Sequence, residues 1–346
     1  MAETALTPAQ SAVRLDVADA GMVLVAQQHA RRMARLVGLD DDSANDAALA
    51  AAELAGNAHR YGRGGQLVLQ PCVDGAALDV VAIDRGPGMS DWDRSFADGY
   101  STTAGSLGGG LGAVSRVATA VTGYTEPGHG TVVSARIGAR ECSAAVAAVG
   151  VPFRGERVNG DAWSWVMDDG GMFVVLADGL GHGPGAAEAS ALAVADPGEL
   201  AALGLPDALL RIHARLRGTR GAAVTVVRIR PAADGDGHEL LAAGAGNVTA
   251  GVVAPDGTVR RTLIGHGTAG LAMRTPVETT TPIPAGGAVV LHTDGLLSSW
   301  DLCARAGAVA ASPSVLAAVL LREHERGSDD VGIVVVRPDV PAGRTE

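Results

Sequence analysis

Two short stretches decide the fold of the first half of the chain: Asp84-Arg-Gly-Pro-Gly-Met89 and Gly105-Ser-Leu-Gly-Gly-Gly-Leu-Gly112. The first follows the apolar run Ala77–Ile83, so we expect it at the end of a strand with Asp84 facing outward. The second opens an amphipathic helix predicted over residues 111–121, whose glycines leave backbone N–H groups free at the positive helix end. A carboxylate that accepts from an adenine amino group, beside an amide-rich phosphate cradle, predicts an ATP pocket.

Composition narrows the class of protein. The chain has 346 residues, which fits two domains, and a net charge of −11, which argues against nucleic acid or a membrane surface as a main partner. It contains no lysine, so a phosphate must be bound by arginine, backbone amides or a metal ion. Three cysteines without zinc spacing, no signal peptide and no membrane-spanning apolar run lead us to expect a soluble cytoplasmic protein.

The pattern of apolar residues predicts two α/β domains, over residues 10–138 and 143–338. In the first we expect strands at 11–17, 66–73, 77–83 and 132–137, and helices at 19–37, 43–61 and 111–121. In the second, strands dominate, at 144–151, 162–167, 172–177, 222–229, 239–245, 248–254, 288–292 and 331–337. Helices are predicted there at 186–195, 206–217 and 314–326.

A second feature of the first domain is the pair Glu53 and Asn57, which lie at i and i+4 and therefore share one helix face. The carboxylate could orient or deprotonate a nucleophile, and the amide oxygen could bind a phosphate-bound magnesium ion. Such a pair alone is more often a solvated face. The glycines alone are also ambiguous, since a dinucleotide fingerprint needs a strand directly before them and a P-loop needs a lysine.

The ordered set of these features resembles the GHKL ATPases, and within them the RsbT-type serine kinases of bacterial stress signalling, over about residues 10–138. The matching text is Glu53-Leu-Ala-Gly-Asn57, Asp84 to Met89, Asp98-Gly-Tyr-Ser-Thr102 and Leu107 to Gly112. The resemblance implies a Bergerat α/β sandwich that binds ATP and Mg²⁺, with Glu53 as general base, Asn57 as magnesium ligand and Asp84 on adenine. It also implies that the nucleotide is lined by Gly86, Gly88, Gly108, Gly110 and Gly112, with Thr131 behind the base.

In the second half, acidic residues recur at strand ends or in loops beside glycine: Asp161, Asp178-Gly179, Asp294-Gly295 and Asp329-Asp330. Carboxylates that converge at a sheet rim offer the hard oxygen ligands that suit Mg²⁺ or Mn²⁺ rather than zinc. Asp-Gly is also a common hairpin-turn signal, so any one of these pairs alone is more often a turn. His182 is expected to support its loop.

These acidic blocks together resemble the metal-dependent PPM-type serine/threonine phosphatases, in the SpoIIE-like branch and most like RsbX, over about residues 143–338. The matching text is Arg154-Gly-Glu-Arg-Val-Asn-Gly-Asp161, Asp178-Gly-Leu-Gly-His-Gly183, Gly244-Ala-Gly-Asn247 and Thr293-Asp-Gly-Leu296. The resemblance implies an α-β-β-α sandwich holding two Mn²⁺ or Mg²⁺ ions that activate a water for in-line attack on phosphorus. The implied ligands are Asp178 between the ions, Asp161 and the Gly179 carbonyl on one, and Asp294 and Asp329 on the other. Gly332 stands where threonine is usual, which leaves Asp329 and Asp330 as alternatives.

Two functions follow as hypotheses. The first is a bifunctional regulator, a Ser/Thr protein kinase joined to a phosphoserine/phosphothreonine phosphatase, acting on STAS-domain antagonists in a partner-switching or stressosome-like pathway. The second is an ATP-binding docking module without kinase activity that regulates the phosphatase or another switch protein. Glu53 favours active chemistry, because a pure binding domain needs no base there. A metabolic ATPase is disfavoured because no further substrate domain is present.

Overall fold

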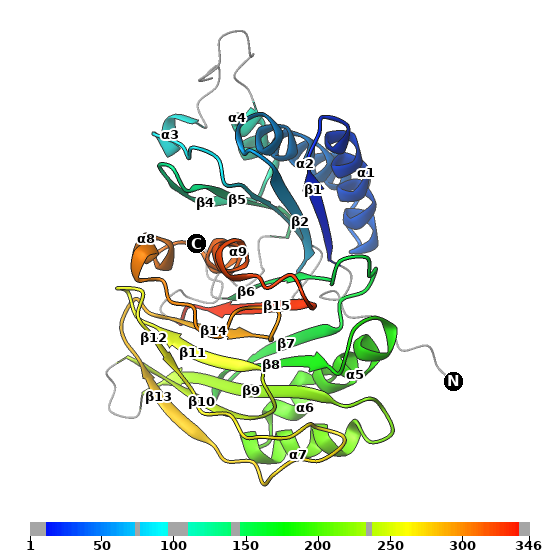
Figure 1. Cartoon of the computed structure of the whole chain (residues 1–346), viewed down its shortest axis with the longest axis vertical. Helices are drawn as coiled ribbons and strands as arrows, with labels where there is room; N and C mark the ends of the chain where they lie inside the picture. The colour runs from blue at the N-terminus through cyan, green and yellow to red at the C-terminus, as the bar shows by residue number, and fades with distance from the viewer. Residues whose placement is uncertain (1–11, 73–76, 96–109, 140–145, 233–236, 339–346) are drawn as a thin grey trace.

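The computed structural model describes residues 12–72, 77–95, 110–139, 146–232 and 237–338 (Figure 1). Within these ranges the strands form three five-stranded sheets, which we call the first, second and third sheet. Their orders are β1-β2-β3-β5-β4, β12-β11-β14-β15-β6 and β13-β10-β9-β8-β7. The second and third sheets pack face to face, and the first lies across a single helix from the second. The predicted class, an α/β sandwich followed by an α-β-β-α sandwich, is confirmed.

The first half of the chain builds the first sheet and the helices on its outer face. Its elements are β1 (Val13–Val17), α1 (Gly21–Leu36), α2 (Asp41–Tyr61), β2 (Gly65–Pro71), β3 (Ala77–Ile83), α3 (Trp92–Ser95), α4 (Gly110–Val117), β4 (Ala120–Glu126) and β5 (Gly130–Gly138). Helix α2 begins where Asp40 Oδ1 accepts the Ser43 N–H at 2.8 Å. Its buried face consists mainly of alanines, which let it lie close against the sheet and α1.

Strand β4 was not predicted. The sequence predicted a helix over residues 111–121, but α4 ends at Val117 and the chain becomes extended at Ala120. The cause is tertiary: β4 pairs with β5 from Ala120 opposite Arg136 to Glu126 opposite Gly130, and this ladder replaces further helical turns.

The second half builds the other two sheets. Its elements are β6 (Val146–Val151), β7 (Asp161–Asp168), β8 (Gly171–Gly179), α5 (Pro184–Val194), α6 (Pro197–Ala201), α7 (Leu205–Arg215), β9 (Ala222–Pro231), β10 (His238–Ala245), β11 (Thr249–Val253), β12 (Val259–Arg261), β13 (Thr279–Ile283), β14 (Ala288–His292), η2 (Cys303–Arg305), α8 (Ala306–Val309), α9 (Pro313–His324) and β15 (Val331–Val336). Helices α5, α6 and α7 cover the outer face of the third sheet, where one apolar cluster fills the space beneath them. A second cluster, which includes Trp163 and Leu176, lies between the two sheets.

Helix α9 joins the two halves. Every residue from Pro313 to Arg322 is buried, as expected for a helix that is covered on all sides. Its side chains share one apolar cluster with strands of the first sheet and of the second, and Figure 1 shows the helix between them. Gln70 Oε1 adds a polar contact by accepting the Gly150 N–H at 2.9 Å. The two halves therefore share a continuous core.

Among the described residues, no helix combines the length and the apolar character needed to cross a bilayer.

Candidate functional sites

The first site is built around Asp84, at the end of β3. Its backbone N–H donates to the Thr131 carbonyl at 2.9 Å, and its Oδ1 accepts the N–H groups of Gly86 and Thr131 at 2.8 and 3.1 Å. Burial raises the pKa of Asp84, while these two N–H donors and the charge of Arg322 oppose the shift. Within the described residues no donor is recorded on Oδ2, so this oxygen is available to a ligand.

Three glycines allow the loop after Asp84 to pack against its neighbours. A Cβ on Gly86 would lie 2.3 Å from the Tyr61 carbonyl oxygen, at the end of α2. Gly88 (φ +76°) and Gly130 (φ +89°) adopt the left-handed region. A Cβ on Gly88 would lie 2.4 Å from a backbone carbonyl oxygen of the facing segment, and a Cβ on Gly130 would lie 2.1 Å from another. These glycines let the loop after Asp84 pack closely against the end of α2 and the β4–β5 turn.

Glu53 and Asn57 of α2 both face the start of α4. A Cβ on Gly110 would lie 2.9 Å from Glu53 Oε2 and 3.8 Å from both side-chain polar atoms of Asn57. Asn57 Oδ1 also accepts from Arg60 Nη2 at 3.1 Å. A carboxylate and an amide thus converge on Gly110, the first residue of this helix. Gly112 is buried within α4. Gly108 and residues 98–102 lie outside the described residues.

The second site lies where β7 and β8 meet the loops after β14 and before β15. Asp161 and Asp178 are paired across the β7–β8 ladder, and Gly179 ends β8. Asp161 is 1% exposed; its N–H donates to Asn159 Oδ1 at 2.9 Å, and its Oδ2 accepts from Thr293 Oγ1 at 2.8 Å. These bonds fix the direction of a buried carboxylate at the sheet rim.

The carboxylates of this site repel one another. Burial, then the charges of Asp294, Asp329 and Asp330, raise the pKa of Asp178 to about 8. Burial and the neighbouring Asp178 raise the pKa of Asp161 well above its usual range. Burial and Asp329 raise that of Asp294. A bound cation would relieve this shared penalty, because it neutralises several carboxylates at once.

The donor set fits a divalent cation, although the described residues contain no cluster of three His, Cys, Asp or Glu side chains gathered closely enough to form a ready-made metal site. Asp294 Oδ1 is buried without a hydrogen-bond partner, while its Oδ2 accepts from Asn247 Nδ2 at 2.7 Å. A buried carboxylate oxygen without a hydrogen-bond partner, among other carboxylates, could bind a cation. Because all of the predicted ligand atoms are oxygens, this cation would be Mg²⁺ or Mn²⁺.

Asp329 and Asp330 have different surroundings. Asp330 is 3% exposed, and its Oδ1 accepts the Phe153 N–H at 2.7 Å, so it anchors the chain that follows β6. Burial raises the pKa of Asp330 to about 6. Asp329 is more exposed and acts electrostatically on both Asp178 and Asp294. Asp330 Oδ2, however, is buried without a hydrogen-bond partner, so both residues stay candidates to face an ion.

Gly332, at the position where the resemblance led us to expect threonine, packs against Asp161. A Cβ on Gly332 would lie 3.2–3.3 Å from Asp161, so a larger residue would crowd that carboxylate. Thr293 Oγ1 instead accepts the Gly332 N–H at 2.9 Å while donating to Asp161. His182 Nδ1 lies 2.7 Å from Glu156 Oε1 and its ring packs on Phe153, so it contacts loop residues.

Comparison with known proteins finds a matching family for each half of the chain. Residues 17–137 match the family described as histidine kinase-like ATPase domain, and residues 168–339 match the family Stage II sporulation protein E (SpoIIE). Over 115 residues, which are 33% of this chain and 86% of the relative, the sequence is 31% identical to the serine/threonine-protein kinase RsbT of Bacillus subtilis (strain 168). The chain belongs to the RsbT family.

Solved structures similar to this RsbT-family chain include one described as "The bacterial stressosome: a modular system that has been adapted to control secondary messenger signaling". It is 25% identical, with a TM-score of 0.50, and the match covers 56% of this chain and 98% of that one. RsbX in complex with magnesium is 20% identical, with a TM-score of 0.46, over 55% of this chain and 92% of its own. The predicted union of an RsbT-type ATPase domain with a SpoIIE-type phosphatase domain is confirmed.

The supporting residues of this RsbT-family chain were not singled out from the sequence. Thr293 and Asn247 stood in quoted motifs, and only Thr293 had a local signal, a hydroxyl directly before Asp294-Gly295. Arg322 had no local signal, because the first-half residues that it contacts, Asp84 and Arg85, are more than 200 positions away.

Proposed function

We propose that this chain is a bifunctional cytoplasmic regulator of a partner-switching pathway, a Ser/Thr protein kinase joined to a Ser/Thr phosphoprotein phosphatase. The observation that carries the kinase assignment is the convergence of Glu53 and Asn57 on Gly110 at the start of α4. A site that only held ATP would need the helix end and Asp84, but it would not need a carboxylate beside the phosphates.

In the first half, Asp84 Oδ2 would accept from the adenine amino group, and the N–H groups at the start of α4 would bind phosphate. Asn57 would hold Mg²⁺, which supplies charge neutralisation of the phosphates when bound. Glu53 would take the proton from the attacking serine or threonine hydroxyl. Gly86, Gly88, Gly108, Gly110 and Gly112 would line the nucleotide, with Thr131 behind the base.

In the second half, Asp161, Asp178, the Gly179 carbonyl, Asp294 and Asp329 would hold two Mn²⁺ or Mg²⁺ ions. Such ions, when bound, acidify water and stabilise charge on phosphorus. The chain's own contribution is orientation: Thr293 holds Asp161, and Asn247 holds one oxygen of Asp294 while leaving the other free. Because the carboxylates have raised pKa values without ions, binding would release protons.

The substrate class we propose is the phosphorylatable STAS-domain protein. The RsbT relative and the similarity to a stressosome structure support this assignment. The test uses a purified STAS protein and labelled ATP. Asp178→Asn protein should accumulate phosphoprotein, and Glu53→Ala protein should still remove phosphate from prelabelled substrate. If neither wild type nor Asp178→Asn labels any STAS protein although ATP is bound, the kinase assignment is wrong.

In that case the second candidate applies, an ATP-binding docking module that regulates the fused phosphatase. The continuous core through α9 favours it, because this core gives the first half a direct mechanical contact with the second.

A further inference from the structure

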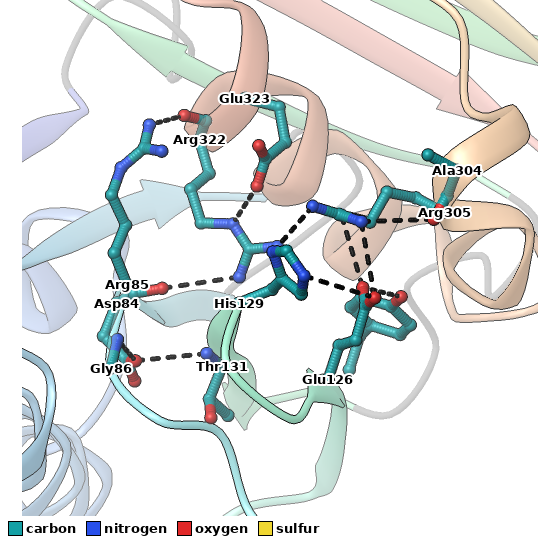
Figure 2. Close-up of polar contacts among 11 residues, drawn as sticks. Asp84, Arg85, Gly86, Glu126, His129, Thr131, Ala304, Arg305, Arg322 and Glu323 are labelled. Carbon is teal, nitrogen blue, oxygen red and sulfur yellow. Dashed lines mark hydrogen bonds and ion pairs between the residues drawn. The ribbon is translucent and has the colours of Figure 1, made fainter.

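The backbone of the nucleotide pocket is bonded to the buried end of α9. Arg322 Nη1 donates to the Asp84 carbonyl at 3.4 Å, and Arg85 Nη2 donates back to the Arg322 carbonyl (Figure 2). The Arg322 side chain is 1% exposed and its Nε donates to Glu323 Oε1 at 2.7 Å, while Nη2 is buried without a partner. A buried guanidinium is costly, so its position constrains both the helix end and the Asp84 loop.

The segment that follows Arg322 is hydrogen-bonded to the loop after Asp294. The His324 carbonyl accepts the Leu297 N–H at 2.9 Å, and the Arg326 N–H donates to the Gly295 carbonyl at 2.8 Å. Gly295 in turn packs against the backbone of Asp330, where an added Cβ would lie 2.0 Å from the carbonyl oxygen. The segment 324–326 thus positions the residue directly after Asp294.

A second contact supports the same segment from the first half. Arg14 of β1 forms an ion pair with Glu325, and both side chains are largely buried. Strand β1, through Arg14, and the loop after β3, through Asp84 and Arg85, therefore hold the chain between Arg322 and Glu325.

We propose that Arg322 is a positioning residue shared by both sites, through which nucleotide binding at Asp84 and cation binding at Asp294 favour each other. The proposal rests on the proposed function, in that both sites must bind their ligands. A nucleotide that orders the Asp84 loop fixes the Asp84 carbonyl, which accepts from Arg322. Arg322 in turn fixes the segment 324–326, which is hydrogen-bonded to residues 295–297. Thermodynamic linkage then requires the reverse effect, so that cations at Asp294 raise nucleotide affinity by the same factor.

The test measures the affinity of a fluorescent ADP at one fixed concentration of free Mg²⁺, with the full chain throughout. In the wild-type background, Asp178→Asn removes the cation site and should weaken ADP binding about fivefold or more, a typical coupling between sites. In the Arg322→Gln background, the same Asp178→Asn change should leave the affinity unaltered. This double-mutant cycle separates coupling from a direct effect of either variant.

Arg337→Gln is the matched control. Arg337 also donates to backbone carbonyls, those of Ala310 and Ala311 at 2.7 and 2.9 Å, but these lie before α9 begins and near neither site. With Arg337→Gln, the weakening caused by Asp178→Asn should persist. Arg322→Lys, which keeps the charge and one donor, should restore part of the coupling.

Arg85→Gln covers the possibility that Arg322→Gln does not fold, because Arg85 is exposed and its loss removes one of the two bonds between the Asp84 loop and the end of α9 while Arg322 stays in place. It should reduce the effect of Asp178→Asn. If Asp178→Asn leaves ADP affinity unchanged in the wild-type background, the coupling is refuted while the proposed function stands. If the wild type binds no ADP, the proposed nucleotide site is itself wrong.

Discussion

The Thr293 hydroxyl donates a buried hydrogen bond of 2.8 Å to Asp161, and the same hydroxyl accepts the N–H of Gly332. A single side chain therefore orients a carboxylate of the proposed metal centre and satisfies the backbone of the next strand. The bond links the loop after β14 to β7 and β15.

Thr293→Val keeps the shape but removes both bonds. It should cost about 1–3 kcal/mol of folding free energy, because a buried carboxylate and a buried N–H lose their partner. It should also raise the Mn²⁺ concentration needed for half-maximal phosphatase activity. Thr262→Val is the control: Thr262 is a buried threonine that donates to the Ala250 carbonyl, so stability should fall without a change in Mn²⁺ dependence. Equal Mn²⁺ requirements in both variants would contradict the role of Thr293.

Asp84→Asn should weaken ADP binding roughly ten- to a hundredfold, the loss of a charged hydrogen bond worth about 1.5–3 kcal/mol. Calorimetry at fixed Mg²⁺ measures this change. Asp256→Asn, at an exposed Asp-Gly turn of the other half, is the control and should bind as the wild type does. An unchanged affinity in Asp84→Asn would show that adenine lies elsewhere.

Asp178→Asn should abolish hydrolysis of p-nitrophenyl phosphate, and EDTA should do the same to the wild type, because the proposed reaction needs divalent ions that Asp178 would help to hold. Asp168→Asn, at the opposite end of β7 where Asp168 pairs with Arg228, should keep activity. Glu53→Ala should keep it as well. Hydrolysis that persists in EDTA would rule out metal-dependent chemistry.

The pH dependence of stability should differ between the metal-free and the Mn²⁺-loaded chain. Asp178, with its pKa raised to about 8, holds a proton in the folded metal-free chain that the unfolded chain releases near pH 4. In EDTA, its contribution to stability is therefore present at low pH and lost as the pH rises from about 4 through 8. Thermal midpoints should fall over this range, less steeply in Asp178→Asn. Added Mn²⁺ should stabilise more at higher pH, because protons compete with the ion; identical slopes in wild type and Asp178→Asn would contradict this.

Most of the longer strands and helices followed from local sequence, whereas strand β4 and the role of Arg322 depend on residues elsewhere in the chain. Asp84 and Asp178 stand beside glycines at strand ends, where the residue types alone indicate the conformation. Strand β4 was missed because its extended form depends on β5, a partner the local pattern does not show. Arg322 was missed for the same reason, since a single arginine in an apolar helix gives no sign of the distant carbonyl it contacts.

The buried helix α9 also determines whether the two halves of the chain can be separated. The apolar inner face of the first sheet, with Val81 and Val132, is covered by a helix encoded almost 200 residues later. Cutting the chain at residues 138–143 would expose the inner face of the first sheet in one fragment and the matching face of α9 in the other. Neither half should therefore be stable when it is produced alone.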